Sequence, residues 1–115
     1  MHEFGIAQRI LEISQKELES RAVTAPVERV VLSVGRLRAI VPDSLTFHFD
    51  IIKTEMPQFR AAALAIREIP IKVNCGECRS SFELQEMSFF CEKCGHPLTV
   101  SSGEELSIDS IDVSD

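Results

Sequence analysis

The spacing of apolar residues along the chain predicts two helices and a first strand. Apolar or small side chains recur at steps of three, four and seven over residues 4–22, with charged and amide side chains between them, as in an amphipathic helix. The stretch VERVVLSVG, residues 27–35, alternates β-branched and polar positions and predicts a strand that ends at its glycine. Residues 41–55 return to helical spacing, and Asp43 or Ser44 can cap the start of this second helix.

Two later segments complete the fold prediction. Residues 59–73 are ambiguous, since their alanines favour a helix while their alternating larger apolar residues fit a strand. We favour the strand, because it leads straight into the first pair of cysteines. Residues 105–113 alternate again, and such a strand needs a partner, which the sheet of the first segment offers. We therefore expect an α+β domain, a small sheet with two helices, formed by residues 1–70 with 99–115 and interrupted by an inserted zinc-ribbon-like segment, residues 71–98.

Composition narrows the class of protein. The chain has 115 residues, of which 44% are hydrophobic and 26% charged, a profile typical of a globular protein. No apolar run approaches the roughly 20 residues of a membrane span, and no secretory signal is recognisable, so we expect a cytoplasmic protein. The net charge is −6 and the last stretch is acidic, which argues against nucleic acid as the main partner.

Four cysteines form the strongest chemical signal. Cys75 and Cys78 make one Cys-x2-Cys pair, and Cys91 and Cys94 make a second pair after twelve intervening residues. Two-residue gaps let both thiolates of a pair face one ion, and four thiolates give the closed tetrahedral site of structural zinc. Iron suits the same four-sulfur set, and so remains an alternative. A closed site lacks an open coordination position, so we expect a structural or regulatory zinc rather than a catalytic one.

The three histidines differ in what they predict. At the N-terminus, the amine of Met1, the amides of His2 and Glu3 and the His2 imidazole lie within a few bonds of one another, and nitrogen donors in a plane suit Ni(II) or Cu(II). Against such a site, terminal residues are usually mobile. We expect His48 to be a partly buried helix residue, and His96 to be a solvated loop residue unless it supports the metal beside it. The chain shows no catalytic triad, phosphate-binding glycine loop or paired carboxylates, so we expect no enzyme.

Several motifs together resemble the HypA/HybF family of hydrogenase nickel-incorporation proteins. They are MHE at the start, VVLSVGRL, VPDSLTFHFDIIK, CGEC with CEKCG, and SGEELSIDSIDV. The resemblance covers essentially the whole chain. It implies a metallochaperone that delivers Ni(II) to the large subunit of [NiFe]-hydrogenase, and in some organisms serves urease, with a nickel-handling GTPase as partner.

The resemblance also implies a fold and ligands. The family fold is an α/β nickel-binding domain with a small zinc domain inserted before the last strand. Nickel would be held as transient cargo by the Met1 amine, the His2 backbone and imidazole, and the Glu3 backbone, with the Glu3 side chain nearby. Zn(II) would be held by the four cysteines. We expect a monomer or weak dimer.

Two other functions fit parts of the sequence. An isolated four-cysteine ribbon can bind protein or nucleic acid without any role for nickel, although basic and aromatic residues do not cluster around these cysteines. A rubredoxin-like electron carrier with iron in the same site is the weaker possibility.

Overall fold

The described residues form two α-helices and two three-stranded sheets. The computed structural model describes residues 2–85, 88 and 90–114. The first sheet has the strand order β2-β1-β6 and the second β4-β3-β5. The elements are α1 (His2–Ser20), β1 (Val27–Gly35), α2 (Pro42–Ile52), β2 (Ala63–Ile69), β3 (Ile71–Cys75), β4 (Ser81–Leu84), β5 (Leu98–Ser102) and β6 (Leu106–Val113). The predicted α+β class is confirmed, and no helix in the described ranges has the length and apolarity to cross a membrane.

The first helix carries the apolar stripe that its spacing predicts. One side of α1 is buried, and its buried side chains are Glu3, Ala7, Ile10, Leu11, Ser14 and Leu18. The helix begins and ends two residues earlier than predicted. It ends before Ala22, which adopts a left-handed conformation with φ of +56°, and this conformation cannot continue a right-handed helix.

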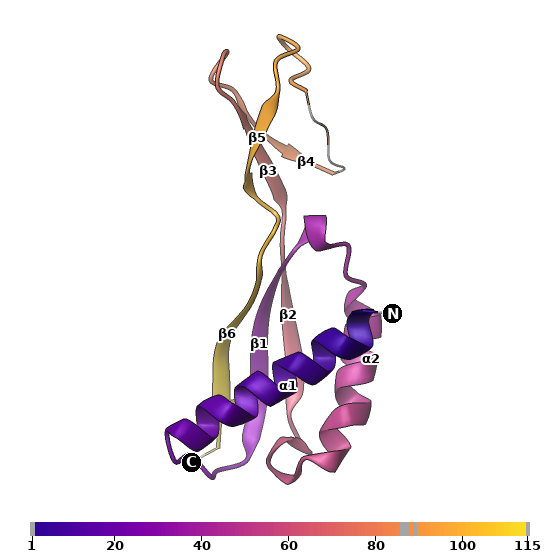
Figure 1. Cartoon of the computed structure of the whole chain (residues 1–115), viewed down its shortest axis with the longest axis vertical. Helices are drawn as coiled ribbons and strands as arrows, with labels where there is room; N and C mark the ends of the chain where they lie inside the picture. The colour runs from indigo at the N-terminus through magenta and orange to yellow at the C-terminus, as the bar shows by residue number, and fades with distance from the viewer. Residues whose placement is uncertain (1, 86–87, 89, 115) are drawn as a thin grey trace. The chain divides into compact units, whose positions relative to one another are not determined.

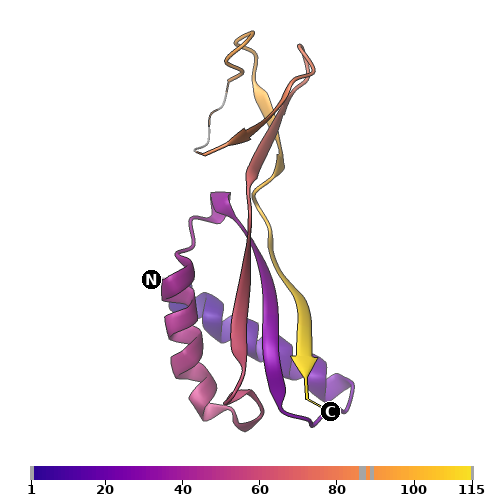
Figure 2. The same ribbon diagram turned by 180° about the vertical axis from the view of Figure 1, so that it is seen from behind.

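The sheet of β2, β1 and β6 supports α1. The helix crosses one face of the sheet, and from behind the strands lie in front of it (Figures 1 and 2). Val30, Leu32 and Val34 of the central strand β1 are buried, as the alternation predicted, but the opposite face is only partly exposed, because Ser33 is buried as well. The last strand of the chain pairs with β1, as the sequence predicted, so the cysteine segment is inserted before the returning strand.

The second helix begins differently from the prediction. Neither Asp43 nor Ser44 caps it. Val41 occupies the N-cap position without a side-chain hydrogen bond, and Pro42 is the first helical residue. Proline suits this position because its fixed φ is already helical and its missing N–H would have had no partner in the first turn. The Val41 amide is bonded instead by the carboxylate of Glu3, from α1.

The ambiguous segment forms strands. β2 and β3 are separated by Pro70, which therefore lies in neither strand interior. β3 is the centre of the second sheet and pairs antiparallel with β4 and β5, with Val73 opposite both Phe82 and Val100. This sheet carries the first cysteine at the end of its central strand.

The chain divides into two compact units. The first comprises Met1–Leu32, Ile40–Arg67 and Ile108–Asp115, and the second comprises Ser33–Ala39 and Glu68–Ser107. The first unit contains both helices and the second contains the cysteines. The functional boundaries drawn from the sequence, residues 1–70 with 99–115 and residues 71–98, stay a prediction.

Candidate metal sites

The four cysteines converge, as their spacing predicted. Their sulfur atoms all lie within 4.8 Å of one another, with 3.7 Å between Cys78 and Cys91 and 3.3 Å between Cys75 and Cys94. Four sulfurs around one zinc ion, each about 2.3 Å from it, stand about 3.8 Å apart. The donor set and its spacing therefore fit a tetrahedral zinc ion. In the described part of the chain, this is the cluster that gathers three or more side chains able to hold a metal.

The first cysteine pair lies in a tight turn after β3. The Cys75 amide donates to the Ser80 carbonyl at 2.9 Å, and the Arg79 amide donates to the Cys75 carbonyl at 2.9 Å. Cys75 is buried, whereas Cys78 is exposed. The Ser80 hydroxyl lies 3.3 Å from the Cys78 sulfur.

The second pair repeats this turn. The Cys91 amide donates to the His96 carbonyl at 2.8 Å, and the Gly95 amide donates to the Cys91 carbonyl at 2.8 Å. Cys91 is buried and Cys94 exposed. Nδ1 of His96, itself an exposed residue, lies 3.3 Å from the Cys94 sulfur. Spacing alone favoured a solvated loop histidine, and the structure adds that this exposed histidine lies beside a sulfur of the four-cysteine cluster.

The pKa values of the two exposed thiols, Cys78 and Cys94, are shifted in opposite directions. The Ser80 hydroxyl and backbone amide lower the pKa of Cys78 to about 6. The His96 amide lowers the pKa of Cys94, but the hydrogen bond with Cys75, partial burial and the hydrogen bonds with the other two cysteines outweigh it and raise that pKa to about 12. The lowered pKa of Cys78 favours its thiolate, which is the form in which a cysteine binds a metal ion.

The N-terminal candidate ligands lie on the first turn of α1. Met1 is outside the described residues. The His2 side chain is 64% exposed, while the neighbouring Glu3 side chain is buried. Oε2 of Glu3 accepts a hydrogen bond from the Val41 amide at 3.3 Å and lies 3.5 Å from Nε2 of His2.

The buried carboxylate of Glu3 remains charged. The Val41 amide holds its pKa below the ordinary value of 4.5, against the opposing effect of desolvation, with smaller contributions from its own amide and from His2. Sequence reasoning placed this side chain near the site, but its bond to the start of α2 depends on how the helices pack. No local signal could have found that contact.

His48 is a partly buried residue of α2, as the sequence predicted. It is half-buried, and its ring meets those of Phe4 and Phe47 edge to face, with centroids 5.6 Å and 5.4 Å away. These contacts make it part of an aromatic cluster on α1 and α2.

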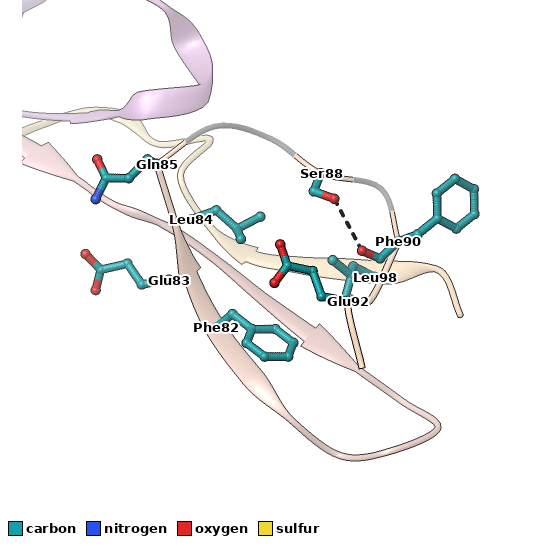
Figure 3. A pocket seen from close by; sticks show the side chains of 8 residues that line it. All are labelled: Phe82, Glu83, Leu84, Gln85, Ser88, Phe90, Glu92 and Leu98. Carbon is teal, nitrogen blue, oxygen red and sulfur yellow. Dashed lines mark hydrogen bonds between the residues drawn. The ribbon is translucent and has the colours of Figure 1, made fainter. Parts of the chain in front are cut away.

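A groove of about 240 Å³ lies in the cysteine-bearing unit (Figure 3). Phe82 and Leu84 point into it from β4, while Glu83 and Gln85 point to the opposite side, as alternating strand residues do. The other residues lining it are Ser88, Phe90, Glu92 and Leu98. The sequence did not predict the groove, because its walls come together only when the strands pair.

Comparisons with known proteins agree on one family. A family model described as hydrogenase/urease nickel incorporation, metallochaperone, matches residues 1–113. The hydrogenase maturation factor HypA of Desulfatibacillum aliphaticivorans is 43% identical over 116 residues, covering 100% of this chain and 88% of its own length. The HypA of Desulfosudis oleivorans is 38% identical over 114 residues, covering 98% of both chains.

Two solved structures share the fold. The solution structure of the nickel metallochaperone HypA from Helicobacter pylori has a TM-score of 0.67 and 22% identity, covering 98% of this chain and 97% of its own. A second solution structure of a HypA protein has a TM-score of 0.72 and 21% identity, covering 99% and 97%.

Proposed function

This chain belongs to the HypA family of hydrogenase and urease nickel-incorporation metallochaperones, and on that basis we propose that it carries Ni(II) on Met1, His2 and Glu3. The recipient is the large subunit of [NiFe]-hydrogenase, in a cytoplasmic reaction assisted by a nickel-handling GTPase, and urease is a second client where it is present. The chain acts as a carrier rather than as an enzyme. Its nickel domain comprises residues 1–70 with 99–115, and its zinc domain residues 71–98.

The observation that carries this proposal is the arrangement of the first turn of α1. His2 and Glu3 are its first two residues, and amides at the start of a helix donate to no carbonyl of the helix itself. Replacing their protons by a metal ion therefore costs the helix none of its internal hydrogen bonds. The partial positive charge at a helix N-terminus also favours the anionic, deprotonated amides.

The Glu3 carboxylate supports the site without being a ligand. Its bond to the Val41 amide holds the first turn of α1 against the start of α2. Its position beside Nε2 of His2 favours the tautomer that carries its proton on Nε2. Nδ1 of the exposed imidazole then keeps a free lone pair, and this nitrogen is the one nearer to the backbone amides.

The zinc ion has a different part. The four cysteines would hold it in a closed set of ligands, where it links the two turns and stabilises the second unit. When bound, it supplies structural cross-linking and no open position for chemistry. The two metals would therefore bind to different donors, nickel to nitrogen atoms and zinc to sulfur atoms.

Calorimetric titration of nickel into untagged, zinc-loaded protein tests the proposal. The wild type should bind about one nickel ion per chain, since His2 supplies one imidazole to one amine. His2→Ala, and a variant with one glycine added before Met1, should both lose this binding. His48→Ala is the matched control, because it removes an imidazole from α2 and should leave nickel binding unchanged. Equal binding by all four proteins would refute an N-terminal site.

A further inference from the structure

The candidate zinc site has a buried half, Cys75 and Cys91, and an exposed edge, Cys78 and Cys94. Cys75 and Cys91 open the two turns and are 1% and 3% exposed. Cys78 and Cys94 close the turns and are exposed. An electrophile or a competing ion therefore reaches the outer two sulfurs first. Burial protects the inner pair, whereas the outer pair can gain protection beyond that of zinc coordination only from hydrogen bonding.

The residue two positions after each exposed cysteine supplies that hydrogen bonding. Ser80 and His96 occupy equivalent positions in the two turns, where the carbonyl of each accepts from the first cysteine of its own pair. The Ser80 hydroxyl and the His96 Nδ1 each lie 3.3 Å from the sulfur of the preceding cysteine. The backbone amides of the same two residues also bond to these sulfurs. Each outer sulfur is therefore approached by a backbone donor and a side-chain donor from a single residue.

We propose that Ser80 and His96 are matched positioning residues, which shield the exposed thiolates of the zinc site by donating side-chain hydrogen bonds to Cys78 and Cys94. A zinc-bound thiolate accepts hydrogen bonds and cannot donate them, so the serine hydroxyl and the imidazole N–H must be the donors. A donor draws on the lone pairs with which the sulfur would attack an electrophile, and it holds the sulfur in place. Ser80 therefore controls the reactivity of Cys78, and His96 controls that of Cys94. The two donors have the same role although one is a hydroxyl and the other an imidazole.

The shielding would also slow the replacement of zinc by cargo nickel, and only this consequence rests on the proposed function. Cargo nickel could displace the resident zinc only where a thiolate can be reached, which is the edge formed by Cys78 and Cys94. The two donors would slow that exchange. The test below needs no nickel, so it succeeds or fails independently of the N-terminal site.

Alkylation of the zinc-loaded full chain by N-ethylmaleimide measures the shielding directly. The chain has four cysteines in all, so every alkylated thiol is a zinc ligand. Peptide mass spectrometry gives the rate at each sulfur, and a chelating dye follows the zinc released. In the wild type, Cys78 and Cys94 should react before Cys75 and Cys91. Earlier reaction of the inner pair would overturn the proposal.

Isosteric variants separate the hydrogen bond from the space that each side chain fills. Ser80→Val should speed alkylation of Cys78 by about threefold to tenfold, the effect of losing one hydrogen bond at an exposed sulfur whose charge is shared with zinc, and leave Cys94 unchanged. Ser80→Thr restores the hydroxyl at the same volume and should return the rate to that of the wild type. His96→Leu should speed only Cys94, and His96→Asn, which keeps a donor, should be closer to wild type.

Ser81→Ala, at the next position in the chain, is the matched control. Its hydroxyl donates to Asn74 at 2.7 Å rather than to a cysteine, so its removal should leave all four rates unchanged. Zinc content and circular dichroism show that each variant is folded and loaded before alkylation. Equal rates for Ser80→Val and Ser80→Thr, or acceleration of the wrong cysteine, would overturn the proposed role of the donors.

Discussion

Gly35→Ala tests a close backbone approach between Gly35 and Gly103 in the second unit. Gly35 has φ of −74° and ψ of 143°, an extended conformation that alanine also adopts, so the substitution introduces no backbone strain of its own. The added Cβ, however, would lie 2.1 Å from both the carbonyl carbon and the oxygen of Gly103. Real contacts of this kind are at least 3.0 Å, so the two segments must separate by about 1 Å.

That separation removes two hydrogen bonds. The Gly35 amide donates to the Glu105 carbonyl at 2.7 Å, and the Leu37 amide donates to the Gly103 carbonyl at 2.8 Å. An added 1 Å or so takes both beyond the range of a hydrogen bond. Two lost bonds, with partly buried groups left unpaired, amount to about 2 to 4 kcal/mol. This is a large share of the free energy of unfolding of a small domain, roughly 5 to 15 kcal/mol.

Urea unfolding followed by far-ultraviolet circular dichroism measures the loss, since the chain lacks the Trp and Tyr that fluorescence would need. The midpoint of Gly35→Ala should fall by about 1 to 2 M at an unchanged slope. Gly76→Ala is the matched control in the same unit, because a Cβ there meets nothing within 4 Å. If both variants unfold at the wild-type midpoint, the close approach of Gly35 to Gly103 is not part of the folded protein.

Three further predictions follow from single side chains. Ser14→Ala should raise the free energy of unfolding by about 1 kcal/mol in urea, because the buried Ser14 hydroxyl has no hydrogen-bond partner among the described residues; a loss of stability would contradict this. Arg79→Gly should raise the melting temperature of the zinc-loaded protein, since Arg79 has φ of +59° where the equivalent turn has Gly95, and the gain should be about 0.5 to 1 kcal/mol. An unchanged melting temperature would show that Arg79 is not strained. The lowered pKa of Glu3 implies that its bond to Val41 contributes fully above the ordinary carboxyl pKa of 4.5 and is lost as pH falls through the lower folded-state pKa. Glu3→Gln should therefore lower the urea midpoint near neutral pH and reduce its fall in acid, whereas parallel pH profiles for both proteins would refute the contribution.

Local patterns in the sequence predicted most of the elements and the clustering of the four cysteines. The spacing of apolar residues predicted α1 and β1, because a helix or strand places its buried residues at a regular period. The two Cys-x2-Cys pairs predicted a shared site for a similar reason, since each pair forms its own turn. The uncertain segment forms strand β2, whose backbone hydrogen bonds to β1 outweigh the helical propensity of its alanines.

Only the tertiary structure decided the contacts between distant segments. The Glu3 carboxylate bonds to Val41, 38 residues away, and this contact depends on how α1 packs on α2. The sequence predicted only that Gly35 ends a strand. The structure shows that a side chain at this position would clash with the backbone of Gly103. The contact between Ser80 and Cys78 is partly local, because the two residues are only two positions apart. The cluster to which Cys78 belongs, however, forms only when the two cysteine turns meet in the tertiary structure. Periodicity reports which face of an element is buried, and it contains no information on which partner covers that face.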